Sequence, residues 1–291
     1  MGISKRHHYI PQFLIKRFAD KDNMLYLYDK EKQAFAKEKR SPKSVFFEMN
    51  RNTWYFDGVP NDNIEKLYAE LDEKFSRDIV EISRSGIITE EALTSILVMA
   101  SSLKWRLPSN DDLFDAKDKE FPYDKLPINI VIKRNDGSDH KEALEYLMNS
   151  ELFKQTKKLI FPFLPFYDNF NISEEKLLRV HRNSYININP NIKSILGDVP
   201  LIESDSNDLE NFGNFILPLS STETFICNDS QSKNIKNATF YLNKDLAMFH
   251  QAKKYIVCND KEYLHQIADV YNQIQANGQI EKINRYLFRL A

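Results

Sequence analysis

Along the first sixty positions, apolar residues occur in short runs that polar turns separate. Residues 24–28 and 33–37 are two such runs around a charged turn, and residues 53–56 precede an Asp-Gly turn at Asp57. Dense apolar or aromatic runs bounded by turn residues are typical of short strands joined as hairpins. We therefore predict a β-rich layer in this part of the chain.

After about sixty residues the apolar spacing changes to three and four positions, which is the spacing of one helix face. One such segment ends near Gly86, and a second runs from Thr89, a good helix-capping residue, to Pro108. A third covers residues 141–160 and stops at the prolines that follow. Between the second and the third, residues 109–139 are acidic, contain prolines and show no periodicity. We expect an irregular surface insertion there, or a mobile lid.

The remainder of the chain returns to short apolar runs with polar residues between them. The connections are too short for helical crossovers, so we expect antiparallel pairing. Helical spacing reappears towards residue 291. The predicted strands are residues 176–182, 185–188, 194–196, 199–202, 215–218, 224–227 and 255–258, and the predicted helices are residues 243–254, 262–275 and 280–290.

Together these segments predict an α+β fold. An N-terminal hairpin layer and a C-terminal antiparallel sheet with terminal helices are expected to pack around a central helical block. The length allows one large domain or two ordinary ones. We treat residues 1–291 as a single domain, with residues 1–108, 109–139 and 140–291 as its natural subdivisions.

Composition and charge narrow the class of protein. Hydrophobic residues make up 42% of the chain, with 20 Phe and 14 Tyr, which is enough to build a core. The net charge of -2 gives no global basic excess, and this weakens without excluding a nucleic-acid partner. The sequence shows neither a signal-peptide core nor a membrane-spanning run, so we expect a cytoplasmic protein with no membrane partner. Cys227 and Cys258 lack the spacing of zinc ligands or of a disulfide framework.

Residues 5–18 contain the densest group of chemically useful side chains in the sequence. His7 and His8 stand side by side, after a basic pair and shortly before Pro11. Histidine exchanges a proton near neutral pH, with an unperturbed pKa of about 6.5, and its neutral imidazole binds metals. This His-His-x-x-Pro segment is therefore the first candidate for a functional site.

The sequence His-His-Tyr-Ile-Pro-Gln-Phe-Leu at residues 7–14 resembles the start of a bacterial family of unknown function, whose members begin His-His-Tyr-Val-Pro-Gln-Phe. The resemblance covers essentially the whole chain, with departures at Gly197, Val199 and Ser221. The resemblance implies that the chain is related to this family, but it indicates no reaction. Later landmarks in the family's order are Tyr-Leu-Tyr-Asp at 26–29, Ser-Pro-Lys-Ser at 41–44, Trp-Arg-Leu-Pro at 105–108, Gly-Asp-Val-Pro at 197–200 and Pro-Leu-Ser at 218–220.

The residue types at these landmarks suit one polar pocket. Histidine can act as a general base or metal ligand, aspartate can orient an imidazole, and arginine or serine can hold an anionic oxygen. The candidate catalytic residues are His7, His8 and Asp198, and the candidate substrate-binding residues are Arg6, Gln12, Arg17, Arg106 and Ser220.

Each candidate also has a purely structural explanation. Adjacent histidines on a strand point to opposite faces, so at most one would reach a common site. Asp198 is a natural turn residue, and Arg106 is favoured near a helix C-terminus by the helix dipole alone. Ser220 lacks the glycine-flanked turn of serine hydrolases.

The nearest enzymatic comparison is with His-Asn-His nucleases, which often open with a His-His-x-x-Pro string before a hairpin. The second ligand is missing here, because no histidine occurs between His8 and His140. We hypothesise that the pocket hydrolyses a phosphodiester or a nucleotide, with a divalent metal as a candidate cofactor. The alternative is a non-catalytic module of a bacterial defence or toxin-type system that binds nucleic acid or a protein. Basic residues interleaved with tyrosines before residue 44 suit that alternative.

Overall fold

The computed structural model describes residues 5–56, 58–122, 126, 129–168, 171–204, 212–229 and 237–290. Its α-helices are α1 (Gln12–Lys16), α2 (Asn63–Ser85), α3 (Glu90–Arg106), α4 (Asp111–Glu120), α5 (Lys141–Met148), α6 (Glu151–Ile160), α7 (Glu174–Asn183), α8 (Ala238–Gln251), α9 (Lys261–Ala276) and α10 (Ile283–Leu290). Its 3-10 helices are η1 (Pro42–Ser44), η2 (Pro108–Asn110), η4 (Phe161–Phe166) and η6 (Ile280–Lys282). Its strands are β1 (Arg6–His8), β2 (Tyr26–Asp29), β3 (Ala34–Phe35), β4 (Phe47–Met49), β5 (Trp54–Phe56), β6 (Val59–Asn61), β7 (Tyr167–Asp168), β8 (Asn171–Ile172), β9 (Ser184–Ile188), β10 (Leu196–Gly197), β11 (Ile202–Glu203), β12 (Phe215–Pro218), β13 (Glu223–Cys227) and β14 (Tyr255–Cys258).

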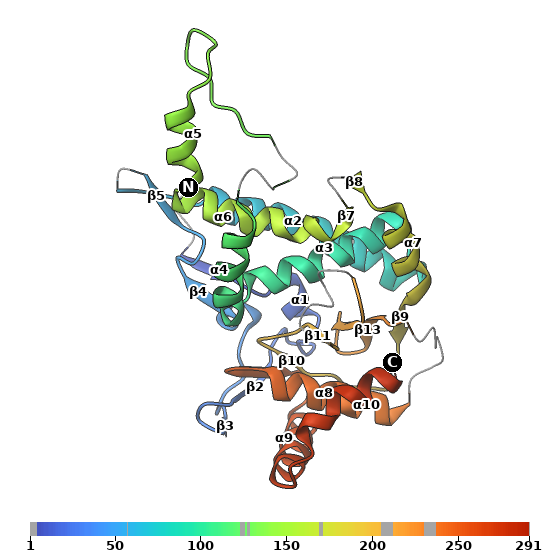
Figure 1. The fold of residues 1–291 in the computed structure, drawn as a ribbon. Helices are drawn as coiled ribbons and strands as arrows, with labels where there is room; N and C mark the ends of the chain where they lie inside the picture. The colour runs from blue at the N-terminus through green and yellow to red at the C-terminus, as the bar shows by residue number, and fades with distance from the viewer. Residues whose placement is uncertain are drawn as a thin grey trace.

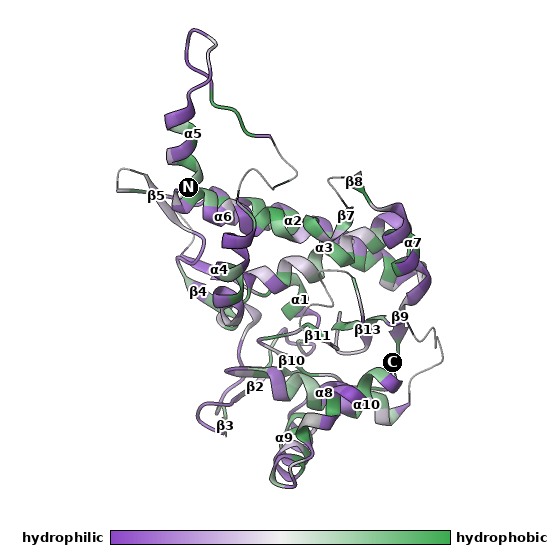
Figure 2. Ribbon diagram, in the orientation of Figure 1, coloured by the Kyte–Doolittle hydropathy of each residue, from purple (hydrophilic) through white to green (hydrophobic). Residues whose placement is uncertain are grey.

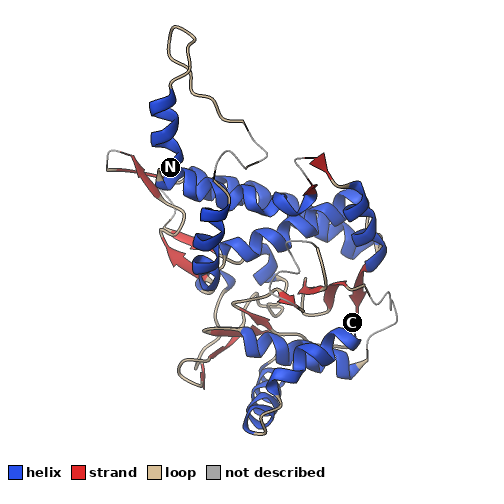
Figure 3. Ribbon diagram, viewed as in Figure 1, coloured by secondary structure: helices blue, strands red, loops and turns tan. Residues whose placement is uncertain are grey.

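The elements form three layers. Helices α2, α3, α6 and α7 lie above the strands in Figure 1, and α8, α9 and α10 lie below them. Figure 3 shows most of the strands between these two helical groups, with the hairpins β5-β6 and β7-β8 beside the upper helices. All strand pairs in the described ranges are antiparallel. The predicted α+β class is confirmed.

Helix α3 forms the centre of the upper layer. It has buried residues on every side, and Ile96, Met99 and Leu103 have no exposed surface. A helix that is buried on every side belongs in a core rather than at a surface. Helix α2 is different, because hydrophobic and hydrophilic residues alternate along it in Figure 2 and only one side is buried. None of the helices in the described ranges is both long enough and apolar enough to cross a membrane.

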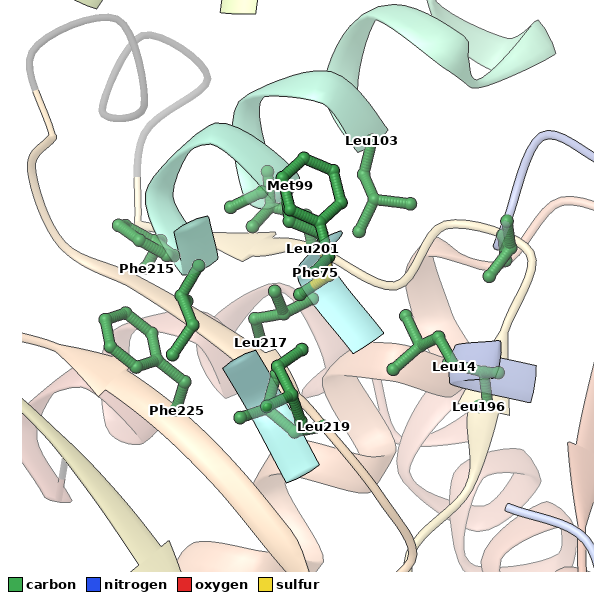
Figure 4. Close-up of a cluster of buried hydrophobic side chains, with 14 of the residues drawn as sticks. Leu14, Phe75, Met99, Leu103, Leu196, Leu201, Phe215, Leu217, Leu219 and Phe225 are labelled. Atoms are coloured by element: carbon green, nitrogen blue, oxygen red, sulfur yellow. The ribbon is translucent and has the colours of Figure 1, made fainter. Parts of the chain in front are cut away.

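The sheet β11-β12-β13-β9 lies between the two helical groups and is buried on both faces. Successive side chains in a strand point to opposite faces. Phe215 and Leu217 of β12 pack in the cluster that contains α2 and α3, whereas Ile216 packs in the cluster that contains α8 and α9. Figure 4 shows Leu217 directed towards Phe75 and the side chains of α3, and Phe225 beside Phe215.

The predicted hairpin at residues 24–37 is present as β2 and β3, but it does not form a separate N-terminal layer. It belongs to a four-stranded sheet, β10-β14-β2-β3, in which Leu27 pairs with Val257 and Tyr28 with Ile256. Leu27, Tyr28 and Asp29 of β2 are buried, so the main-chain groups at both edges of the strand need hydrogen-bond partners. Strands β5 and β6 form the second predicted hairpin, and its turn residue Asp57 lies outside the described residues.

One predicted strand is a helix, and two others are displaced, because the strands expected at residues 194–196 and 199–202 are found at Leu196–Gly197 and Ile202–Glu203. Residues 176–182 belong to helix α7, whose Ser173 side chain accepts a hydrogen bond from the Lys176 amide. Glu174 and Glu175 occupy the first turn, where negative charge is favoured by the helix dipole. These N-terminal signals outweigh the short apolar run that suggested a strand.

Three helix boundaries also differ from expectation. Residues 109–139 contain helix α4, because Phe114 is fully buried against Trp105 and Phe161. Residues 141–160 form two helices instead of one, and Ser150 caps the second by accepting from the Phe153 amide. The helix expected from residue 243 begins earlier, at Ala238.

Candidate functional site

The two histidines of the N-terminal motif lie on strand β1. His7 pairs in register with Glu48, and His8 with Phe47, both on β4. His7 has no exposed surface and His8 is 6% exposed. Neither imidazole is therefore presented to solvent, and their contacts differ because neighbouring side chains of a strand point to opposite faces.

His7 joins the β4–β5 connection to the upper helical layer. Its Nδ1 accepts a hydrogen bond of 2.8 Å from the main-chain N–H of Asn52. The Asn52 side-chain amide donates to Oε2 of Glu65 on α2 at 2.7 Å, and this oxygen lies 3.9 Å from His7 Nδ1. An accepting Nδ1 places the proton of a neutral imidazole on Nε2.

His8 makes a different set of contacts. The Gln12 amide lies 3.2 Å from Nδ1, in position to donate, and the ring packs 5.7 Å from that of Phe47. Its Nε2 is buried and forms no hydrogen bond of normal geometry with the described residues. Burial, together with the positive charge of Arg106, lowers the pKa of His8 to about 4. The imidazole is therefore uncharged at neutral pH.

Arg106 is buried behind the histidine segment, with 5% of its surface exposed. Its guanidinium donates to both carboxylate oxygens of Asp72 at 2.7 and 3.2 Å, and to the main-chain oxygen of His8 at 2.9 Å. It also lies 4.3 Å from the centre of the Tyr68 ring. These contacts occupy the arginine within the protein and fasten β1 to α2 and α3.

Arg17 and Ser220 belong to a second polar cluster, around the β12–β13 turn. Arg17 donates to the Leu219 carbonyl oxygen and to Ser83 Oγ, each at 2.8 Å, and is ion-paired with Glu223. Ser220 Oγ accepts from the Thr222 amide within the turn. The cluster connects α1, α2 and the turn. The remaining predicted residue of the segment, Arg6, lies 5.1 Å from the Phe47 ring.

Asp198 organises the loop between α8 and β14. Its carboxylate accepts hydrogen bonds from three consecutive main-chain N–H groups, those of Lys253 at 2.7 Å, Lys254 at 2.6 Å and Tyr255 at 3.1 Å. Burial raises the pKa of Asp198, and the three donors and the charge of Lys30 act in the opposite direction. The aspartate thus shapes the loop that carries two lysines.

A half-open cleft of about 560 Å³ lies where these segments meet. It is lined by Tyr9, Glu31, residues 44–48, Pro108, Ser109, Asp198, Val199 and residues 253–255. Four landmarks that are far apart in the sequence supply part of this lining, namely Tyr9, Ser44, Pro108 and Asp198. Of the residues predicted to share one pocket, Asp198 lines this cleft. His7, His8 and Arg106 support its wall from behind, and Ser220 lies in the separate cluster around the β12–β13 turn.

Two acidic residues of the cleft have basic partners. Glu48 Oε2 lies 2.6 Å from Nη1 of Arg51, and Glu31 Oε2 lies 3.7 Å from Nζ of Lys254. Arg51 also binds both carboxylate oxygens of Asp111 on α4, which anchors this rim to the helical layer. Neither acid therefore leaves an uncompensated negative charge facing the cleft.

Lys253 is the exception to this pairing. It is exposed, and within the described part of the chain no carboxylate forms an ion pair with its ammonium group. Beside it, burial raises the pKa of Tyr9, and the negative charges of Asp198 and Glu48 raise it further, so the phenol stays protonated. The cleft thus offers an available cation and a hydroxyl donor.

Sequence reasoning did not find Lys253, Lys254 or Glu48 as site residues. The two lysines follow α8 without any recognisable motif, and Glu48 follows a short aromatic run. Tyr9 lies within the histidine motif, and that motif was the sequence signal that could have indicated the cleft. As for metals, no group of three or more His, Cys, Asp or Glu side chains in the described ranges is arranged to hold an ion. Cys227 and Cys258 are both buried.

The fold and cleft define an α+β protein in which four of the sequence landmarks contribute to one recess. The chain belongs to the family described as protein of unknown function (DUF4238), whose model matches residues 6–291. Comparison with curated proteins and with solved structures gave no match.

Proposed function

We propose that the cleft binds a small phosphate-bearing ligand of the nucleotide class. The observation that carries this proposal is the Lys253 ammonium group, which forms no ion pair within the described ranges. In the same cleft Glu31 and Glu48 have basic partners, and the Asp198 carboxylate accepts three main-chain hydrogen bonds. An ammonium group at the mouth of a partly enclosed recess attracts anions and binds phosphate as a point charge.

The size and walls of the cleft support the same proposal. Its volume of about 560 Å³ falls within the range of small-molecule sites, roughly 300–1,000 Å³. Tyr9, Phe47 and Tyr255 supply ring surface, on which a base can stack, and Ser44 and Ser109 supply hydroxyl groups. Such a lining suits a ligand with a flat ring and a charged end.

Thermal unfolding with increasing AMP or ATP tests this proposal. A ligand that binds only the folded protein raises the melting temperature as its concentration rises. The wild type should show this shift, and Lys253→Glu should lose it. Lys21→Glu, an equal charge change on an exposed turn outside the cleft, should keep it. If neither nucleotide shifts the wild type, or if Lys253→Glu responds equally, nucleotide binding is wrong.

Hydrolysis of a phosphodiester ligand of the nucleotide class is a second candidate function of the cleft, and the position of Glu48 favours it. This carboxylate faces the same cleft as Lys253 and is 44% exposed. In the proposed step Glu48 takes a proton from water as the water oxygen bonds to phosphorus. The ester P–O bond breaks, and the leaving oxygen takes a proton from solvent. This step assigns the base to Glu48 instead of the predicted His7 or His8.

Chromatography of nucleotide mixtures after incubation tests turnover separately from binding. Glu48→Gln should bind as the wild type does and release no product, whereas Glu38→Gln, on an exposed segment, should retain turnover. Absence of product from the wild type, with and without added Mg²⁺, would leave a non-catalytic binding module.

We extend the proposal to the cellular setting, as a cytoplasmic module of a bacterial defence or toxin-type system. This cellular setting rests on the nucleotide ligand proposed above. If a long nucleic acid or a protein is the ligand instead, competition with AMP shows whether it binds in the cleft. A ligand that binds outside the cleft remains bound when AMP saturates the cleft.

A further inference from the structure

A second hollow, of about 300 Å³, lies beside the cleft. Its lining includes Lys104 and Leu107 at the end of α3, Leu201 in the segment after Asp198, Gln251 at the end of α8 and Asn284 on α10. Nothing in the function proposed above uses this hollow.

The same three chain segments form the walls of both recesses. The turn after α3 contributes Pro108 and Ser109 to the cleft, and Leu107 and Asn110 to the second hollow. The loop after α8 contributes residues 253–255 to the cleft, while Gln251 lines the second hollow. Val199 lines both recesses. The two recesses are therefore neighbours, with Val199 as the ridge between them.

The chemistry of the second hollow differs from that of the cleft. Lys104 Nζ lies 3.0 Å from Glu203 Oε1, so its charge is compensated. The Gln251 amide nitrogen donates to the carbonyl oxygens of Val199 at 2.5 Å and Leu201 at 2.9 Å, which leaves its amide oxygen as an acceptor. A neutral group with hydrogen-bond donors fits this hollow better than a second phosphate does.

Lys253 stands beside the ridge. Its main-chain N–H donates to Asp198, the residue next to Val199. The main chain of Lys253 is thus close to the junction of the two recesses, so that its side chain can extend to the linking phosphate of a two-unit ligand.

We propose that the two recesses form one site for a ligand of two nucleoside units joined by a phosphate. One nucleoside occupies the cleft, the other occupies the second hollow, and the linking phosphate lies near Lys253 above Val199. This inference rests on the proposed nucleotide-binding function and specifies its ligand class.

Calorimetric titration of the full chain with AMP and with adenylyl-3′,5′-adenosine tests the inference. We expect the dinucleotide to bind about tenfold more tightly than AMP or better, because it fills both recesses. Asn284→Trp fills the second hollow from α10. It should remove the advantage of the dinucleotide and leave the affinity for AMP within about threefold. Val80→Trp, on an exposed position of α2, is the control for a bulky substitution.

The outcomes separate the two proposals. If AMP binds through Lys253 but the dinucleotide binds no more than about threefold more tightly, the two-unit site is wrong and the nucleotide cleft stands. If neither ligand binds the wild type, both proposals are wrong. The comparison of the two ligands on the wild type decides the question even if a tryptophan variant fails to fold.

Discussion

Arg106 donates a hydrogen bond of 2.9 Å to the main-chain oxygen of His8, across 98 positions of sequence. This bond joins the N-terminal histidine motif to the Trp-Arg-Leu-Pro segment at the end of α3. The two most conspicuous motifs of the sequence thus meet inside the protein, where His8 and Arg106 hold the wall of a cleft that Tyr9 and Pro108 of the same motifs line.

Removing the Arg106 guanidinium should destabilise the protein strongly. In Arg106→Met, Asp72 becomes a largely buried carboxylate without its partner, and breaking a buried pair in this way costs about 3–5 kcal/mol. Urea unfolding measures the free energy. Arg77→Met removes an exposed pair with Glu73 and should change stability by less than about 1 kcal/mol. Equal effects of the two substitutions would mean that Arg106 has no special structural role.

His8 should make stability depend on pH between about 6.5 and 4. The folded protein holds the pKa of His8 at about 4, below the value of 6.5 in the unfolded chain, so the unfolded state takes up the proton first as pH falls. The stabilisation is fully present above pH 6.5 and is lost as pH falls towards 4, by about 3 kcal/mol. In His8→Gln this change of the unfolding free energy with pH should disappear.

Urea unfolding at several pH values between 7 and 4.5 measures the slope for both proteins. His181→Gln, at an exposed position of α7, is the matched control and should keep the wild-type slope. A wild-type slope that survives in His8→Gln contradicts the assignment to His8.

Asp198→Asn should loosen the loop at residues 253–255. An asparagine offers one acceptor oxygen where the carboxylate offers two, and its amide group faces main-chain donors. The lost charge-assisted bonds should cost about 2–4 kcal/mol. Hydrogen exchange of the amides of residues 253–255 should accelerate, while Asp269→Asn, on the exposed side of α9, should leave them protected. Unchanged protection in Asp198→Asn would show that these bonds do not hold the loop.

Gly197→Ala tests the close contact between β10 and α8. A β-carbon at this position would lie 3.0 Å from the Ala252 β-carbon, 3.2 Å from Met248 Sδ and 3.3 Å from the Met248 carbonyl oxygen. Such overpacking should cost about 1–3 kcal/mol. Calorimetry should show a lower melting temperature, and Thr239→Ala, exposed on α8, should show little change. A variant as stable as the wild type would mean that α8 shifts at no cost.

Local pattern was sufficient where an element has strong signals of its own. The three- and four-residue spacing from Ile64 predicted α2, and Thr89 marked the start of α3. It was insufficient at α7, because Leu177, Leu178 and Val180 resemble a short strand when their helix cap is overlooked. Apolar residues in a brief run suit either structure, so the cap and the neighbouring elements decide.

The candidate site, too, could be predicted from the sequence only in part. The sequence determined which segments carry the landmarks, among them Tyr9, Pro108 and Asp198, and the composition from which an α+β core is built. Tertiary structure alone decided that His7 and His8 lie inside the wall while Lys253 faces the cleft. The reason is physical: side-chain burial depends on the partners that long-range pairing brings to a strand, and those partners have no fixed spacing in the sequence.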